Sequence, residues 1–159
     1  MDQLARIRTD KRQVLLICSS RTNQMTESPE NAKAILLMED DDEVREAMTE
    51  FLKLRGYRVI QATNEADSIE ESVKSEYQIE LILIDQDLNS DDALAIGRRV
   101  RDHFKMGQEV PVVVLPAEFK KELEGTDEAV GGLDCKSYLA NGQQLEGLLN
   151  RLLHRDGEI

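Results

Sequence analysis

The chain has 159 residues, of which 40% are hydrophobic and 33% charged, and its formal net charge is −12 at pH 7. This length suffices for one domain with its own hydrophobic core. The acidic surplus disfavours classes of protein that bind nucleic acid or anionic membranes through bulk electrostatic attraction.

The beginning of the chain differs in charge from the rest. The first 26 residues are net basic, whereas the remaining residues hold all of the acidic surplus. We expect residues 1–31 to form a flexible N-terminal extension. Two hypotheses stay open for its origin: residues 1–24 are an over-extended reading frame with Met25 as the true start, or they are a basic docking arm. The apolar run Val14–Cys18 is too short for a membrane span or an ordinary signal sequence.

The two cysteines, Cys18 and Cys135, show no metal-ligand spacing. A pair of cysteines without such spacing, in a chain without a disulfide framework, is typical of a reduced compartment. We therefore expect a cytoplasmic protein.

Short apolar runs alternate with amphipathic segments along the rest of the chain. A short continuous apolar run indicates a strand buried on both faces, whereas apolar residues three and four positions apart indicate a helix. The predicted strands are Ala34–Met38, Tyr57–Ala62, Leu81–Ile84, Pro111–Leu115 and Ser137–Ala140. The predicted helices run from about Asp42 to Arg55, then over Glu65–Ser75, Ala93–Phe104, Glu118–Val130 (interrupted by Gly125) and Gln143–Leu153.

Five strands that alternate with five helices predict an α/β fold with a doubly wound parallel sheet. In the five-stranded, flavodoxin-like (βα)5 arrangement the strand order is 2-1-3-4-5, and ligands bind where the carboxyl ends of strands one and three meet. That order places Asp40 beside Asp85.

Acidic residues follow both of these strands: Glu39–Asp42 end the first, and Asp85 ends the third. Carboxylates held close together repel one another unless a hard cation lies between them, and Mg²⁺ is the usual choice. The residues from Asp41 to Glu43 have a simpler interpretation, as solvated charges in the first turn of a helix.

Taken in this order, the segments resemble the receiver domain of two-component response regulators over about residues 33–154. The resemblance rests on Ile35–Arg45, Leu81–Asp85, Asp92–Leu94, Pro111–Leu115, and Tyr138–Leu139 ahead of Leu145. It implies a receiver domain at residues 32–155 followed by a short tail, 156–159. It implies a histidine kinase or phosphotransfer protein and a downstream protein as partners, and it leaves a homodimer open. Because of the acidic surplus, we expect no direct contact with nucleic acid or membrane.

The resemblance also assigns roles to the acidic residues. Asp85 would be the phosphoacceptor, and it would share Mg²⁺ with Asp40 and with the backbone carbonyl of Asp87, while Glu39 would act through water. The chemistry demands such a cation, because an anionic nucleophile must approach an anionic phosphoryl group.

At three switch positions, the chain can be compared with the family pattern: two positions differ from it and one matches it. Pro116 stands where the family has a Ser or Thr hydroxyl, and Asn141 stands where it has a phosphoryl-pairing Lys. Tyr138 matches the aromatic residue that responds to the hydroxyl contact. Lys136 would supply the missing cation only if the strand register were shifted.

Two other functions compete with a phosphorylated receiver. The losses at Pro116 and Asn141 favour a pseudo-receiver, a binding module that works without phosphorylation, although the retained acidic residues disfavour it. The triplet Asp85-Gln86-Asp87 is similar to the DxD motif of haloacid-dehalogenase-type phosphatases, but no late pair of aspartates follows a strand. We therefore expect a signalling domain rather than an enzyme.

Overall fold

The computed structural model describes residues 32–118 and 120–154. The predicted extension at 1–31 and the predicted tail at 156–159 lie outside the described residues, so both stay predictions.

Strands and helices alternate along most of the described chain. The strands are β1 Ala34–Glu39, β2 Arg58–Ala62, β3 Ile79–Asp85, β4 Val112–Val114, β5 Asp127–Gly131 and β6 Asp134–Ser137. The helices are α2 Asp42–Leu54, α3 Glu65–Lys74, α4 Ser90–His103, α5 Gly142–Leu153 and one 3₁₀ turn, η1 Lys121–Leu123.

The strands form one sheet in the order β2-β1-β3-β4-β6-β5. The first five strands in this order are parallel, and β5 joins the edge antiparallel to β6. The predicted α/β class is confirmed, and so is the placement of β1 between β2 and β3. The sheet differs from the prediction in having six strands rather than five.

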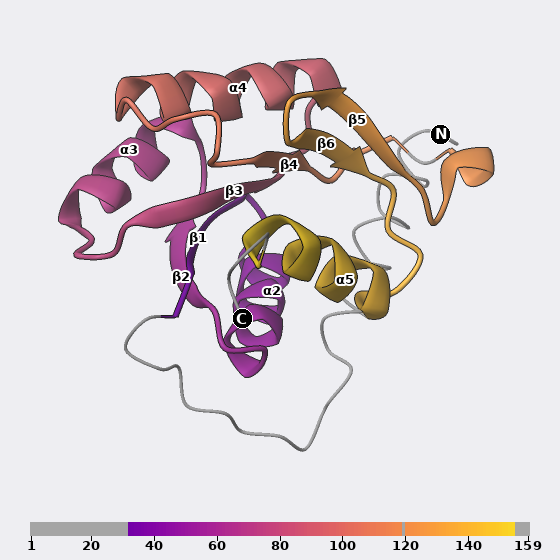
Figure 1. The fold of residues 1–159 in the computed structure, drawn as a ribbon, viewed down its shortest axis with the longest axis horizontal. Coiled ribbons are helices and arrows are strands. Elements are labelled where there is room, and N and C mark those ends of the chain that lie inside the picture. The colour runs from indigo at the N-terminus through magenta and orange to yellow at the C-terminus, as the bar shows by residue number, and fades with distance from the viewer. Residues whose placement is uncertain (1–31, 119, 155–159) are drawn as a thin grey trace.

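Helices cover both faces of the sheet, with α2 and α5 on one face and α3 and α4 on the other (Figure 1). Alternate residues of each central strand therefore enter two separate apolar clusters, which explains why these strands are apolar along their whole length. On the α2 and α5 face the strands contribute Ile35, Leu37, Leu81, Leu83, Val113, Leu115 and Cys135. On the opposite face they contribute Leu36, Met38, Ile60, Ala62, Ile79, Ile82, Ile84, Val112 and Val114.

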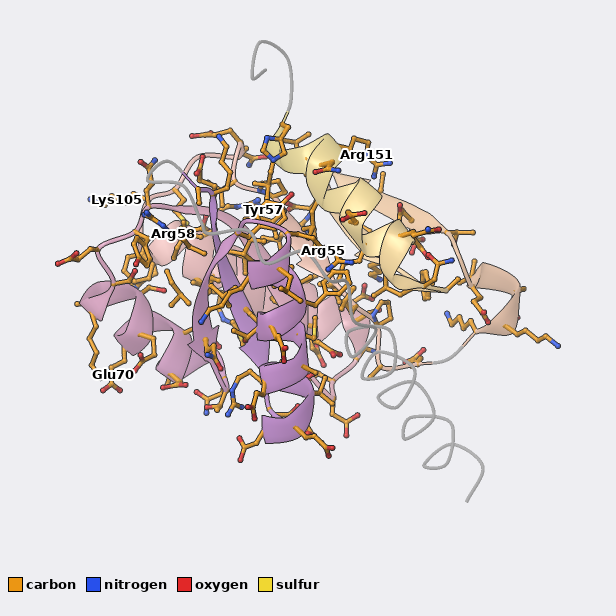
Figure 2. The ribbon with its side chains drawn as sticks, turned by 90° about the horizontal axis from the view of Figure 1, so that it is seen from below. Arg55, Tyr57, Arg58, Glu70, Lys105 and Arg151 are labelled. Atoms are coloured by element: carbon orange, nitrogen blue, oxygen red, sulfur yellow. The ribbon has the colours of Figure 1, made fainter. Side chains whose placement is uncertain are left out.

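The two helices of the first face are joined at their ends. Arg55, which follows α2, lies between α2 and α5 (Figure 2), forms an ion pair with Glu146 at 3.1 Å, and stacks 3.6 Å from the ring centre of Phe51. The hydroxyl of Tyr57 donates a hydrogen bond to Asn150 at 3.3 Å. These contacts fix α5 against α2.

The predicted fourth helix, Glu118–Val130, is wrong. The described part of this segment forms η1 and then the antiparallel strand β5, because Gly125 adopts a positive φ of 86° and ends the helical turn. Gly131 and Gly132 also have positive φ values, of 126° and 56°, and turn the chain back into β6. A β-hairpin thus stands where a helix was expected.

The predicted fifth strand, Ser137–Ala140, is shifted by three residues. The observed strand is β6, Asp134–Ser137, so it includes Lys136 and ends before Tyr138. The apolar run that suggested a strand at 138–140 lies after β6 and leads into α5.

An ion cluster accounts for the polar composition of β6. Asp134 is 3% exposed, and its carboxylate accepts hydrogen bonds from Arg101 at 2.8 and 3.1 Å, from Arg98 at 3.0 Å and from the backbone of Val112 at 2.8 Å. These bonds satisfy a charge that burial would otherwise penalise. The cluster holds α4, β4 and β6 together.

Among the described residues, none of the helices combines the length and the apolar character that crossing a membrane requires.

Candidate functional site

The carboxyl ends of β1 and β3 bring two acidic residues side by side. Glu39 and Asp85 are the last residues of these strands and are paired directly in the parallel register. Glu39 is fully buried and Asp85 is 3% exposed. By strand alternation, both side chains lie on the face covered by α2 and α5, because Leu37 and Leu83 pack there. This part of the predicted site is assembled.

The turn after β1 is built from its own acidic residues. The carboxylate of Glu39 accepts a hydrogen bond from the backbone of Asp41 at 2.9 Å. Asp41 caps α2 by accepting bonds from Glu43 at 2.9 Å and Val44 at 3.1 Å. Asp40, exposed, is held between these two anchored residues. The turn therefore places Asp40 at the carboxyl end of β1, one residue after the Glu39 that pairs with Asp85.

Asp41 to Glu43 have the structural role that the sequence indicated. Asp41 is the N-cap of α2, and Asp42 and Glu43 are in its first turn, where negative charge is favourable. Asp42 also forms an ion pair with Arg45 at 2.5 Å, while Arg45 donates to the backbone carbonyl of Glu39 at 2.9 Å. Arg45 thereby ties the end of β1 to α2.

The loop after β3 is fixed by a residue that sequence reasoning did not single out. Gln86 is 8% exposed, and its side-chain amide donates to the carbonyl of Thr63 at 2.9 Å, in the loop that follows β2. Asp87 is exposed, and Asn89 caps α4 by accepting a bond from Asp91 at 2.8 Å. No sequence pattern marked Gln86, because its partner is a backbone atom 23 residues away.

The far side of the site is formed by the end of β4. Leu115 donates a backbone hydrogen bond to Ile84 at 2.8 Å, so β4 continues alongside β3 as far as Asp85. Pro116 follows, partly buried, and Ala117 is buried. Pro116 has neither a side-chain donor nor a backbone N–H, so this residue offers no hydrogen bond to a bound anion.

Lys136 lies on the other face of the sheet, with its side chain 12% exposed, and forms an ion pair with Asp91 at 2.7 Å. The hydrogen bond from Lys136 is the main cause that lowers the pKa of Asp91, and the same bond raises the pKa of Lys136. Asp91 was not singled out from the sequence, because an acidic residue in the first turn of a helix is common.

The two remaining switch positions serve the entry to α5. Tyr138 follows β6, is partly buried, and exchanges backbone hydrogen bonds with Thr126 at 2.9 Å and Gly125 at 2.7 Å. Asn141 is the N-cap of α5, and its side-chain oxygen accepts a bond from Gln144 at 2.9 Å. Asn141 thus has a structural partner of its own.

The donor set fits a small hard cation only in part. Within residues 32–118 and 120–154, no three His, Cys, Asp or Glu side chains form a group that could hold a metal ion. The carboxylates of Glu39, Asp40 and Asp85 therefore do not form such a group there. The donor atoms predicted at this edge are oxygens, from the carboxylates of Asp40 and Asp85 and the backbone of Asp87. Mg²⁺ keeps several waters and commonly takes one or two carboxylates, so the chemistry of this set suits it.

Comparison with known proteins matches residues 35–140 to the family described as "Response regulator receiver domain". One similar protein is the transcriptional regulatory protein GltR of Pseudomonas aeruginosa, which is 29% identical over 123 residues, or 77% of this chain. The matched region covers 48% of GltR, so the chain spans about half the length of that relative.

Proposed function

This chain belongs to the response regulator receiver domain family, which acts in two-component signalling, and we propose that it accepts a phosphoryl group on Asp85. The observation that carries the proposal is the position of Asp85. It is the last residue of β3, it is buried, and it lies in register with Glu39 at the edge where Asp40 also stands.

The reaction needs little from the protein beyond position and charge. A carboxylate oxygen of Asp85 attacks phosphorus and forms a new P–O bond. The bond from phosphorus to the donor breaks, and the donor leaves as acetate from acetyl phosphate or as an imidazole, which takes up a proton, from phosphohistidine. The strand end and the hydrogen bond from Gln86 to Thr63 hold the nucleophile in place.

Mg²⁺ is part of the proposal. Asp40, Asp85 and the backbone carbonyl of Asp87 would hold it, with Glu39 acting through water, and it would neutralise charge on the phosphoryl oxygens. The oxygen-only donor set and the exposure of Asp40 support this assignment.

A second candidate function is a pseudo-receiver that binds its partner without phosphorylation. Two observations favour it: Pro116 offers no donor at the end of β4, and the oxygen of Asn141 is engaged in capping α5. The buried pair of Glu39 and Asp85 favours phosphorylation, because burying carboxylates is costly in a site that has no use for them.

Family membership implies a histidine kinase or a phosphotransfer protein as the upstream partner. We propose that output passes through protein contacts, with no direct contact with nucleic acid or membrane, that a homodimer is one form of that contact, and that the protein works in the cytoplasm. We also propose that residues 32–155 are the receiver unit, with 1–31 as an extension and 156–159 as a tail.

The first prediction tests the acceptor. Incubation with acetyl phosphate and Mg²⁺ should add one phosphoryl group to the intact protein, and Asp85→Asn should abolish the addition, because an amide does not attack phosphorus. Intact-mass spectrometry measures the product.

Asp102→Asn is the matched control, since it makes the same chemical change at an exposed carboxylate on α4 that is outside the proposed site. It should retain phosphorylation. A folded wild-type protein that gains no phosphate, with or without Mg²⁺, would reject the proposal and favour the pseudo-receiver. Phosphate that persists in Asp85→Asn would place the acceptor elsewhere.

A further inference from the structure

The loops that follow β2 and β3 are joined by a hydrogen bond that passes the end of β1. Strand β1 lies between β2 and β3, and its last two residues pair with Ala62 of β2 and Asp85 of β3. The next residues of the two outer strands are Thr63 and Gln86. The side-chain amide of Gln86 donates to the carbonyl of Thr63 at 2.9 Å. This bridge therefore connects the loops on either side of the turn that holds Asp40.

The Thr63 end of the bridge is anchored by Asp67, in the first turn of α3. One carboxylate oxygen of Asp67 accepts hydrogen bonds from the backbone N–H of Thr63 at 2.8 Å and from its hydroxyl at 3.1 Å. The backbone N–H of Asp67 in turn donates to the side chain of Asn64, the N-cap of α3, at 2.8 Å. Reciprocal bonds of this kind fix the start of a helix. The carbonyl of Thr63 is therefore an acceptor in a fixed position.

The Gln86 end of the bridge controls the backbone of Asp87. Gln86 is 8% exposed, so its amide would be costly to leave without a partner. Its backbone carbonyl accepts a hydrogen bond from Leu88 at 2.8 Å, which closes a tight turn centred on Asp87. The side chain of Asp87 is exposed. The position of the Asp87 backbone therefore depends on how the residue before it is held.

The bridge matters for a metal because the proposed ligands lie on two different segments. Asp40 follows β1, whereas the backbone carbonyl of Asp87 belongs to the loop after β3. Mg²⁺ demands a near-ideal octahedral arrangement of oxygens, so its affinity depends on the spacing of its ligands. Residues that orient ligands commonly change the affinity for a metal by about ten- to hundredfold. A bond that ties the loop after β3 across the end of β1 therefore acts on this spacing.

We propose that Gln86 is a positioning residue for Mg²⁺, and that Asp67 supports it through Thr63. The amide of Gln86 is engaged with Thr63, so it acts through the backbone of Asp87. The inference rests on the proposed function and adds two residues, Gln86 and Asp67, to the same site. Their effect is on the affinity for the metal rather than on the reactivity of Asp85.

Loss of the bridge should weaken the binding of Mg²⁺, which is the second prediction. Gln86→Met nearly keeps the size of the side chain and removes the amide, so it should raise the dissociation constant for Mg²⁺ about tenfold. Asp67→Ala should raise this constant about two- to fivefold, because Gln86 keeps its partner but the partner loses its anchor. Amide NMR shifts of residues 85–88 during a Mg²⁺ titration, without any phosphodonor, measure both constants.

Two further variants and one kinetic measurement separate positioning from a general structural role. Gln61→Met is the matched control, since it makes the same change at an exposed glutamine of β2, and it should bind Mg²⁺ like the wild type. Gln86→Asn keeps the amide on a shorter stem and should recover part of the affinity. With acetyl phosphate, Gln86→Met should need about tenfold more Mg²⁺ for its half-maximal rate, and its rate at saturating Mg²⁺ should stay within about twofold of the wild type.

The outcomes distinguish this inference from the proposed function. Unchanged Mg²⁺ affinity in Gln86→Met, or an equal loss in Gln61→Met, would overturn the inference and leave the acceptor role of Asp85 intact. If Gln86→Met does not fold, Asp67→Ala decides in the same way. Mg²⁺ binding that depends on Gln86, in a protein that takes up no phosphate, would overturn the acceptor role alone. A wild-type protein that binds no Mg²⁺ would overturn the inference together with the proposed metal site.

Discussion

The thiol of Cys135 lies in the core between the sheet and α5, among Val113, Leu145 and their neighbours. Burial, followed by the charge of Asp127, raises its pKa to about 11. The free thiol is therefore almost entirely protonated near neutral pH, and the reactive thiolate is scarce.

The third prediction follows from that pKa. In a Cys18→Ser background, Cys135 should react with a disulfide reagent at pH 8 about a hundredfold more slowly in the folded protein than in urea. A thiol assay measures both rates. Because the folded pKa is raised, the stability from this neutral group is fully present below about pH 9 and is lost as the pH rises toward 11. Equal rates in the two states would contradict this placement of Cys135.

At the same scale, the sequence allowed the two strand-end residues of the site to be placed, but not the residues that fix the loop and helix after β3. Asp85 and Glu39 could be placed because each ends a continuous apolar run, and two such runs were expected to be adjacent. Gln86 and Asp91 could not, because their partners lie 23 and 45 residues away and hydrophobic periodicity does not report such contacts.

At the scale of elements, α4 lies on β3 and β4 at a distance set by one glycine. A Cβ atom built on Gly97 would meet Val112 and would lie 2.7 Å from Ile84. The helix approaches the strands this closely only because the side chain is absent.

The fourth prediction compares two glycines in helices. Gly97→Ala should destabilise the protein by about 1–3 kcal/mol, since overpacking outweighs the gain in helix propensity. Gly147→Ala on α5, where nothing lies within 4 Å, should stabilise it by up to about 1 kcal/mol. Urea denaturation measures both. A stabilised Gly97→Ala variant would show that the contact is not tight.

The two strands that were not predicted correctly, β5 and β6, both lack the continuous apolar run that marks a buried strand. Strand β6 contains Asp134, Lys136 and Ser137, whose burial depends on ion pairs and hydrogen bonds rather than on apolar character. A pattern of hydrophobicity therefore favoured the apolar run after it. Strand β5 is exposed at almost every residue, so it lacks the apolar run that marks a buried strand. The four strands with apolar interiors were all predicted at nearly their observed positions.

At the scale of the whole molecule, stability in acid depends on the ion cluster of Asp134. Burial alone would raise the pKa of Asp134, but hydrogen bonds from Arg101, the backbone of Val112 and Arg98 together lower it. The stability from this ionised group is therefore present above its unfolded pKa, about 4, and is lost as the pH falls through the lower folded value.

The fifth prediction is that Asp134→Asn costs about 3–5 kcal/mol at pH 7, because the buried charge of Arg101 would lose its anionic partner. The difference from wild type should shrink below about pH 4. Urea denaturation at the two pH values measures it, with Asp102→Asn as the control, since Asp102 is an exposed carboxylate next to Arg101 on α4. A difference that stays constant with pH would contradict the role of the ionised Asp134.

The hairpin that replaces the expected fourth helix leaves β5 at the border of the sheet, with one row of backbone groups facing outward. Such a border can seed edge-to-edge aggregation. Here the strand has five residues, its register breaks between Ala129 and Gly131, and it carries Asp127 and Glu128. Two copies that met along this border would bring like charges together, so β5 protects the molecule from joining its sheet to that of a neighbour.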